Sequence, residues 1–147
     1  MAGLWSAVGV FALGGVGWVV TSFVAQPFRH FFDLRNEVIH KSVLYDNVSA
    51  VQKVGANDEV EQVSLDGDEL TRLREAQDTF RDLAARMRAF ALNEPFAVRL
   101  VSLWEFDPMA ASSALLAVSN TLHQFGGDRA TAKSKLEAVL RFRTVAD

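Results

Sequence analysis

The hydrophobic and polar positions divide the chain into a long uncharged opening segment and a remainder in which charged and apolar residues alternate at helical spacing. From Ala2 to Phe28 there is no Asp, Glu, Lys, Arg or His. A helix rises about 1.5 Å per residue, so about 20 apolar residues cross the roughly 30 Å hydrocarbon core of a bilayer. The sequence therefore predicts a transmembrane helix over residues 2–27.

Two other interpretations of this segment compete with a retained span. A cleaved signal peptide has a positively charged start, whereas no Lys or Arg precedes Arg29 here. A fully buried helix of a soluble domain is the second. The basic residues Arg29, Arg35 and Lys41 all follow the segment. The positive-inside rule then predicts a single-pass protein of the cell inner membrane with a cytoplasmic C-terminal domain.

Small residues recur along one side of the predicted span at alternating four- and three-residue steps. They are Gly3, Ala7, Val10, Gly14, Gly17 and Thr21. Such a seam lets neighbouring helices approach closely, so it predicts self-association in the bilayer, with the same residues lining any pore. The alternative is that glycine is simply common in transmembrane helices.

Pro27 ends the span in this prediction, and an amphipathic juxtamembrane helix follows over residues 28–48. Its apolar positions are Phe28, Phe31, Phe32, Leu34, Val38, Ile39 and Tyr45. An aromatic face with basic flanks suits either the lipid headgroup boundary or packing against the rest of the domain, and the sequence leaves both open.

The remainder predicts an all-α fold. Residues 49–66 have mostly short, polar or acidic side chains, a composition that predicts a flexible connector. The pattern of residues 67–147 predicts a small cytoplasmic helical bundle. Its first helix begins with a capping box formed by Asp66 and Glu69 and ends near Pro95. The predicted buried seam of this helix is Leu70, Leu73, Phe80, Ala84, Met87 and Ala91.

Three further helical segments complete the predicted bundle. The first is a short helix or turn from Pro95 to Trp104. Its packing positions are Phe96, Leu100 and Leu103. Asp107-Pro108 then supplies an N-cap and a preformed first turn for a helix that runs to about His123. After Gly126-Gly127, Asp128 can cap a last helix. The inward positions of that helix are Leu136, Val139, Leu140 and Phe142.

One basic feature stands out from an acidic background. The chain has 15 Lys plus Arg against 18 Asp plus Glu, which argues against bulk nucleic-acid binding. Arg74, Arg81 and Arg88 nevertheless recur every seven residues beside the apolar seam. Guanidinium groups in a row could hold the phosphates of a nucleotide or oligonucleotide. Pairing with acids such as Asp78, or with a neighbouring subunit, is the favoured explanation.

No motif indicates catalysis, a cofactor or a metal. The chain has no cysteine and no phosphate-binding loop, and its Gly14-Gly15-x-Gly17 cluster falls within the predicted span. Glu37 and His40 have the Glu-x-x-His spacing of carboxylate-bridged metal bundles, but the further carboxylates of such a site are missing. We therefore expect no enzyme activity.

Short stretches over most of the chain outside the connector carry a family resemblance. They are Gln26-Pro27-Phe28, Leu34-Arg35-Asn36-Glu37-Val38, Leu44-Tyr45-Asp46-Asn47-Val48, Leu83-Ala84-Ala85-Arg86-Met87-Arg88, Glu94-Pro95-Phe96 and Ala117-Val118-Ser119-Asn120-Thr121-Leu122. Together they resemble a widespread, mostly uncharacterised family of short single-span bacterial membrane proteins. Asp46 departs from the family's Tyr-Ala-Asn-Val pattern. A more distant similarity is to the Hailong-type channel effectors of anti-phage defence, which an oligonucleotide from a partner nucleotidyltransferase holds shut.

The first functional hypothesis is a homo-oligomer whose spans gather into a pore, with the cytoplasmic helices sensing an anionic ligand. The resemblance implies that this ligand is an oligonucleotide or nucleotide made by a neighbouring nucleotidyltransferase. The alternative is a membrane-tethered adaptor that recruits a cytoplasmic protein partner with its helical domain. A structural component of a secretion or division complex is a third possibility. All three place the chain in the lipid bilayer, and the first requires self-association.

Overall fold

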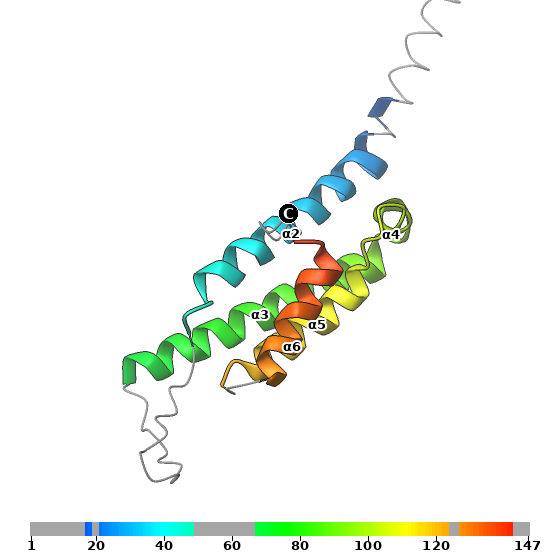
Figure 1. Cartoon of the computed structure of the whole chain (residues 1–147). Helices are drawn as coiled ribbons and strands as arrows, with labels where there is room; N and C mark the ends of the chain where they lie inside the picture. Colours follow the sequence, from blue (N-terminus) through cyan, green and yellow to red (C-terminus); the bar gives the residue numbers. More distant parts are fainter. Residues whose placement is uncertain (1–16, 19–20, 49–66, 124–126, 143–147) are drawn as a thin grey trace, which may run out of the picture.

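Every element that the structure describes is helical. The computed structural model describes residues 17–18, 21–48, 67–123 and 127–142, and no strand occurs within these ranges. The elements are η1 (Thr21–Ala25), α2 (Gln26–Leu44), α3 (Gly67–Asn93), α4 (Pro95–Ser102), α5 (Pro108–Thr121) and α6 (Gly127–Leu140) (Figure 1). The prediction of an all-α helical bundle is confirmed at this level.

The polypeptide passes from η1 into α2 without a break. Pro27 occupies one of the first two positions of α2, and the residue before the helix, Ala25, already has helical angles (φ −70°, ψ −40°). The boundary between two helices that is expected at Pro27 is therefore absent, whereas the end of the span at this residue stays a prediction. Proline has no backbone N–H and its ring crowds the carbonyl four residues earlier, and here the wider π-helical turn of η1 covers the residues in which that crowding falls.

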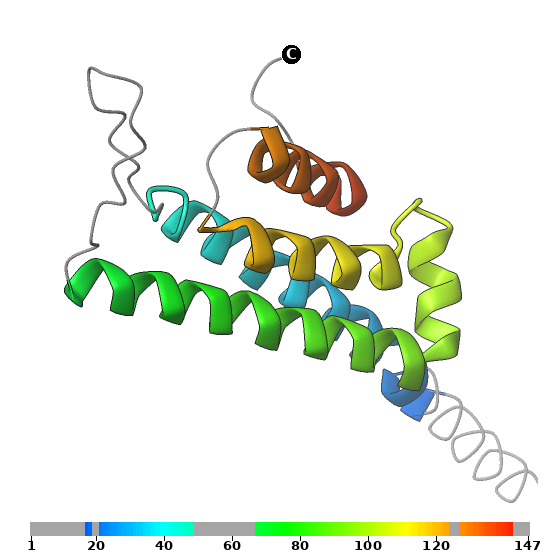
Figure 2. The ribbon, with the colours of Figure 1, turned by 90° about the horizontal axis from the view of Figure 1, so that it is seen from below.

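The core is built by α3, α5 and α6, which pack in succession, while α2 lies along α3 (Figure 2). Its buried apolar residues come from all these helices and from α4. The largest fully buried side chains are those of Phe31, Leu34, Leu83, Met87, Leu115, Leu136, Leu140, Val38 and Val101. One continuous apolar core therefore joins α2 to the rest of the bundle.

The apolar face of α2 packs on protein. Phe31, Leu34 and Val38 are at most 1% exposed. The ring of Phe31 contacts those of Phe90 on α3 and Phe106 before α5, with centroids 5.7 and 5.3 Å apart. Between the two interpretations that the sequence leaves open, the structure thus selects packing against the domain for this face.

The buried seam of α3 is wider than predicted. Leu73, Phe80, Ala84 and Met87 are buried as expected, whereas Leu70 and Ala91 are only half-buried. The helix additionally buries Ala76, Leu83 and Phe90. Because α3 packs against both α2 and α5, it needs a broader apolar arc than the single seam of a helix pair.

The expected orientation of α4 is wrong. Its inner face is formed by Ala97 and Val101, both fully buried, while Phe96 and Leu103 are 55% and 78% exposed and Leu100 is half-buried. Ala97 and Val101 are four residues apart and share one face of the helix. With those small side chains turned inward, the larger ones necessarily lie on other faces.

Helix α5 begins as the sequence predicts. The carboxylate of Asp107 accepts a hydrogen bond from the backbone N–H of Ala110 at 2.9 Å, and Pro108 follows in the first turn. At α6, Asp128 lies inside the first turn instead of preceding the helix, because α6 begins at Gly127. Its negative charge still interacts favourably with the helix dipole at the N-terminus of α6. Leu136 and Leu140 are buried as predicted, and Val139 and Phe142 are partly buried.

The predicted transmembrane helix lies mostly outside the described residues, because only residues 17–18 and 21–27 of that segment are described. The connector over residues 49–66 lies wholly outside them. Among the helices that are described, none has both the length and the apolar character needed to cross a membrane.

If α2 is an integral part of the bundle, removing a buried leucine from it destabilises the whole domain. Leu34→Ala should lower the free energy of unfolding by about 2–5 kcal/mol, because it leaves a cavity in the core. Leu44→Ala, on the same helix but 54% exposed, should change it by less than about 0.5 kcal/mol. Urea titration of the full-length protein in detergent, followed by circular dichroism, measures both. Equal effects of the two substitutions would contradict this packing.

Candidate functional site

Polar contacts at three places, two on α2 and one at Asp46 just after it, hold this helix against α3 and α6. The first of these contacts is made by Arg35, whose Nε donates to the carbonyl of Leu140 at 2.8 Å and whose Nη2 donates to that of Arg141 at 2.9 Å. The last carbonyls of a helix have no partner within the helix, so Arg35 satisfies the C-terminal end of α6 and places a positive charge there. Burial lowers the pKa of the Arg35 guanidinium.

The turn after α4 joins the same cluster. Arg141 and Glu105 both have left-handed backbone angles, with φ of 50° and 63°. Their side chains form an ion pair at 2.8 Å, and Arg141 also donates to the carbonyl of Trp104 at 3.1 Å. The guanidinium of Arg35 lies 5.6 Å from the centre of the Phe106 ring. Helix α2, the α4–α5 turn and the end of α6 therefore meet around Arg35.

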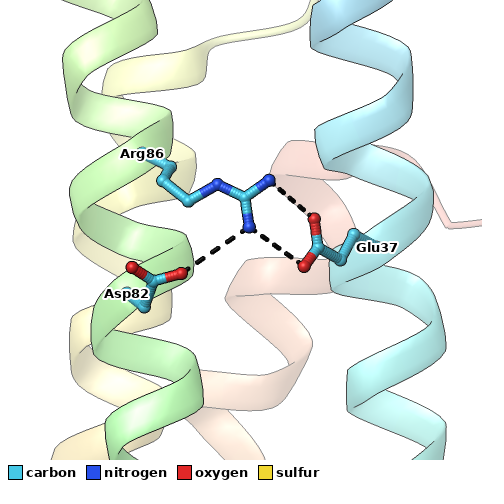
Figure 3. A network of polar contacts seen from close by, with 3 residues as sticks. All are labelled: Glu37, Asp82 and Arg86. Carbon is cyan, nitrogen blue, oxygen red and sulfur yellow. Dashed lines mark hydrogen bonds and ion pairs between the residues drawn. The ribbon is translucent and has the colours of Figure 1, made fainter.

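The second contact is a two-pronged ion pair between α2 and α3 (Figure 3). Arg86 donates from Nη1 and Nη2 to the two carboxylate oxygens of Glu37 at 3.0 and 2.8 Å, and Asp82 lies 3.6 Å from the same guanidinium. The hydrogen bonds that Arg86 donates to the Glu37 carboxylate raise the pKa of Arg86. The side chains are 43% and 37% exposed, so solvent screens the pair, but its paired geometry fixes the register of α2 on α3.

The ion pair with Arg86 involves Glu37, the carboxylate of the Glu-x-x-His pattern with His40. Glu37 is held by Arg86, and Asp33 lies 3.8 Å from Arg29. His30 stacks edge-on against the ring of Phe90 with centroids 5.9 Å apart. Within the described ranges, no three His, Cys, Asp or Glu side chains come together as a potential metal site.

The third contact is centred on Asp46, just after α2. Its carboxylate pairs with the ammonium of Lys133, and its backbone carbonyl accepts from Arg129 at 3.0 Å, both on α6. Beneath it lies a cavity of about 30 Å³ bordered by Ser42 and Tyr45. The Ser42 hydroxyl is buried and has no hydrogen-bond partner among the described residues. A space of this size and polarity suits a single water molecule.

The predicted anion-binding arginines all lie on the exposed surface of α3. Arg81 forms an ion pair with Asp78 at 3.6 Å, both well exposed, as the pairing explanation expects. Arg74 and Arg88 are also exposed. Seven helical residues span about 10.5 Å, so the stripe extends over roughly 21 Å. Only an extended polyanion could contact all three side chains together.

Two members of the predicted small-residue seam are described, Gly17 and Thr21. The Thr21 hydroxyl donates to the backbone carbonyl of Gly17, four residues earlier, at 2.8 Å. Both residues are exposed in the single chain, and a Cβ added at Gly17 would meet no atom within 4 Å. The seam residues Gly3, Ala7, Val10 and Gly14 lie outside the described part of the chain.

Comparison of the chain with protein-family models, curated proteins and solved structures finds no match. The resemblances seen in the sequence therefore stay predictions. The structure adds the contacts of Arg35, Glu37 and Asp46, which sequence reasoning missed. No local signal reveals them, since their partners lie 49 to 106 residues away in the chain.

A double-mutant cycle measures the ion pair that fixes α2 on α3. Glu37→Gln, Arg86→Gln and the combined variant should show a coupling free energy of about 0.5–1 kcal/mol, because both groups are part-exposed but share two hydrogen bonds. Arg88→Gln, on the same helix, serves as the control partner and should show no coupling to Glu37→Gln. Urea unfolding of the full-length protein supplies the free energies, and additive Glu37 and Arg86 effects would contradict the geometry.

Proposed function

We propose that this protein is a membrane-anchored homo-oligomer in which the helical bundle controls the packing of the N-terminal segments, which together form a pore. The single observation that supports this most is the continuity of the chain between them. Helix α2 is embedded in the bundle by Phe31, Leu34 and Val38, and it follows without a break from η1, whose residues Thr21–Ala25 belong to the uncharged segment.

A continuous helix transmits movement, whereas a flexible linker does not. In the proposed protein, any shift of α3 or α6 acts on α2 through the contacts of Arg35, Glu37 and Asp46. That displacement passes along the helix to the predicted span. A pure anchor for an adaptor would need no such stiff connection, so the arrangement favours the controlled pore over the tethered adaptor.

The control requires a ligand that binds the closed and open arrangements unequally. The exposed Arg74, Arg81 and Arg88 are the proposed contact for it. Their spacing of about 10.5 Å suits an extended oligonucleotide better than a single nucleotide. The resemblance to anti-phage channel effectors proposes the same class of ligand, and with it a place in the inner membrane and in defence.

The predicted span has no charged residue to form an ion-selective ring. Ions in the proposed pore would move past small side chains, backbone groups and the hydroxyl of Thr21. Thr21 is exposed in the single chain. Because this lining is uncharged, the proposed gate is a narrow apolar constriction, which closes a pore by expelling water.

The seam is tested by two matched pairs of substitutions. Gly14→Leu with Gly17→Leu should abolish both the oligomer and discrete conductance steps in planar bilayers, because the added side chains keep neighbouring helices apart. Gly9→Leu with Gly15→Leu adds the same bulk away from the seam and should preserve both. Cross-linking in detergent reports the oligomer.

Three outcomes of this experiment separate the hypotheses. Loss of oligomer and conductance together supports the pore. Absence of conductance in the unmodified protein over a range of voltages and oligonucleotides would remove the pore hypothesis. Retention of protein-partner binding by the seam variant, with no conductance from any variant, would favour the adaptor.

The arginine stripe is tested by the salt dependence of oligonucleotide binding. For single strands, the slope of log K against log salt is about −0.7 per phosphate contacted, so Arg74→Gln, Arg81→Gln and Arg88→Gln together should reduce it by about 2. Arg72→Gln with Lys135→Gln removes exposed charge elsewhere on the bundle and should leave the slope nearly unchanged. An equal change in both variants would argue for non-specific attraction.

A further inference from the structure

Large apolar side chains collect on the outer surface of α4 and the residues beside it. Phe96, Leu103 and Trp104 are 55%, 78% and 52% exposed, and Leu92, at the end of α3, is 63% exposed. These four residues form what we call the α4 patch. Isolated exposed hydrophobic residues are ordinary, but several within one short stretch of chain mark an interaction surface.

The α4 patch lies at the end of the bundle where the N-terminal segment joins it. The ring of Trp104 contacts that of Phe28, near the start of α2, with centroids 4.9 Å apart. Both ribbon views place α4 beside the start of α2 and far from its C-terminal end (Figures 1 and 2). Whatever surrounds the base of the N-terminal segment therefore lies close to the patch.

The chemistry of this surface suits a lipid headgroup layer. Phe96, Arg99 and Leu103, the residue that caps the end of α4, are three and four residues apart and therefore lie on one side. Arg99 is exposed and forms no ion pair with any residue that the structure describes. Aromatic rings favour the boundary between water and hydrocarbon, and an arginine among them can extend to lipid phosphates.

We propose that the α4 patch docks on the cytoplasmic headgroup layer of the bilayer that the N-terminal segment crosses. This inference rests on the proposed function, since it takes that segment to be a span. It then holds the bundle to the membrane at two places, the base of α2 and α4. Neighbouring copies in the proposed oligomer meet along the small-residue seam, whereas the α4 patch combines aromatic rings with the exposed Arg99, which suits lipid headgroups.

Tryptophan fluorescence tests the docking, because the chain has only Trp5, Trp18 and Trp104. Replacing Trp5 and Trp18 by Phe leaves Trp104 as the reporter on the patch. Replacing Trp5 and Trp104 by Phe leaves Trp18 as the reporter on the predicted span. Both full-length variants are reconstituted into vesicles of phosphatidylcholine and phosphatidylglycerol that carry bromine at either shallow or deep acyl positions.

We expect Trp104 to be quenched at least twofold more strongly by the shallow than by the deep bromines. Quenching of Trp18 with none at Trp104 would overturn the docking and leave the span intact. Absence of quenching at both would overturn the proposed function as well. Stronger quenching of Trp104 by the deep bromines would contradict a position at the headgroup boundary.

A second variant checks that the patch itself causes the contact. In the background that retains only Trp104, Phe96→Asn with Leu103→Asn should reduce the shallow quenching at least twofold. Val43→Asn with Leu44→Asn, also exposed but at the other end of α2, should not. Circular dichroism of both variants shows whether they are folded. Equal quenching in the patch variant and its control would overturn the proposal.

Discussion

The burial of one face of α2 is the constraint on which the rest of the structure depends. Phe31, Leu34 and Val38 enter the same core as α3 and α5, so a helix that the sequence places next to a membrane becomes a structural member of the bundle. Its polar side then carries Arg35 and Glu37, whose partners lie on α6 and α3. A helix held on both sides cannot tilt or rotate alone, and its movement is coupled to that of the domain.

The sequence predicts this fold well wherever the determining signal is local. The apolar periodicity of α2 and the cap at Asp107 depend on residues within one or two turns, and both are found in the structure. At Pro27 the sequence predicts that two helices meet, whereas in the structure η1 continues into α2. Proline usually interrupts a helix, and this effect is also local. Here a π-helical turn precedes Pro27, and the presence of a proline alone does not reveal whether such a turn forms. The glycine seam stays a prediction, since most of its residues lie beyond the described part of the chain.

The polar contacts could not be predicted because they join distant parts of the chain. Glu37 and Arg86 are separated by 49 residues, and only the packing of α2 on α3 brings them together. Helix α4 shows the opposite limit. The helical spacing of Phe96, Leu100 and Leu103 predicts a core face, yet the smaller Ala97 and Val101 occupy the core. Hydrophobicity alone does not distinguish an apolar face that is buried in the core from one that is exposed. Where such a prediction fails, the exposed apolar face indicates a surface that contacts something other than water.

The proposed pore requires one stiff helix between the bundle and the N-terminal segment. The chain has no cysteine, so Thr21→Cys and His40→Cys can carry spin labels at two exposed positions on either side of Pro27. Full-length labelled protein is diluted with unlabelled protein in lipid nanodiscs. Pulsed electron–electron double resonance then measures the distance between the two spin labels. A continuous helix predicts one narrow distance distribution near ~28 Å for this separation. A broad or two-component distribution would show a joint between the two parts and contradict it.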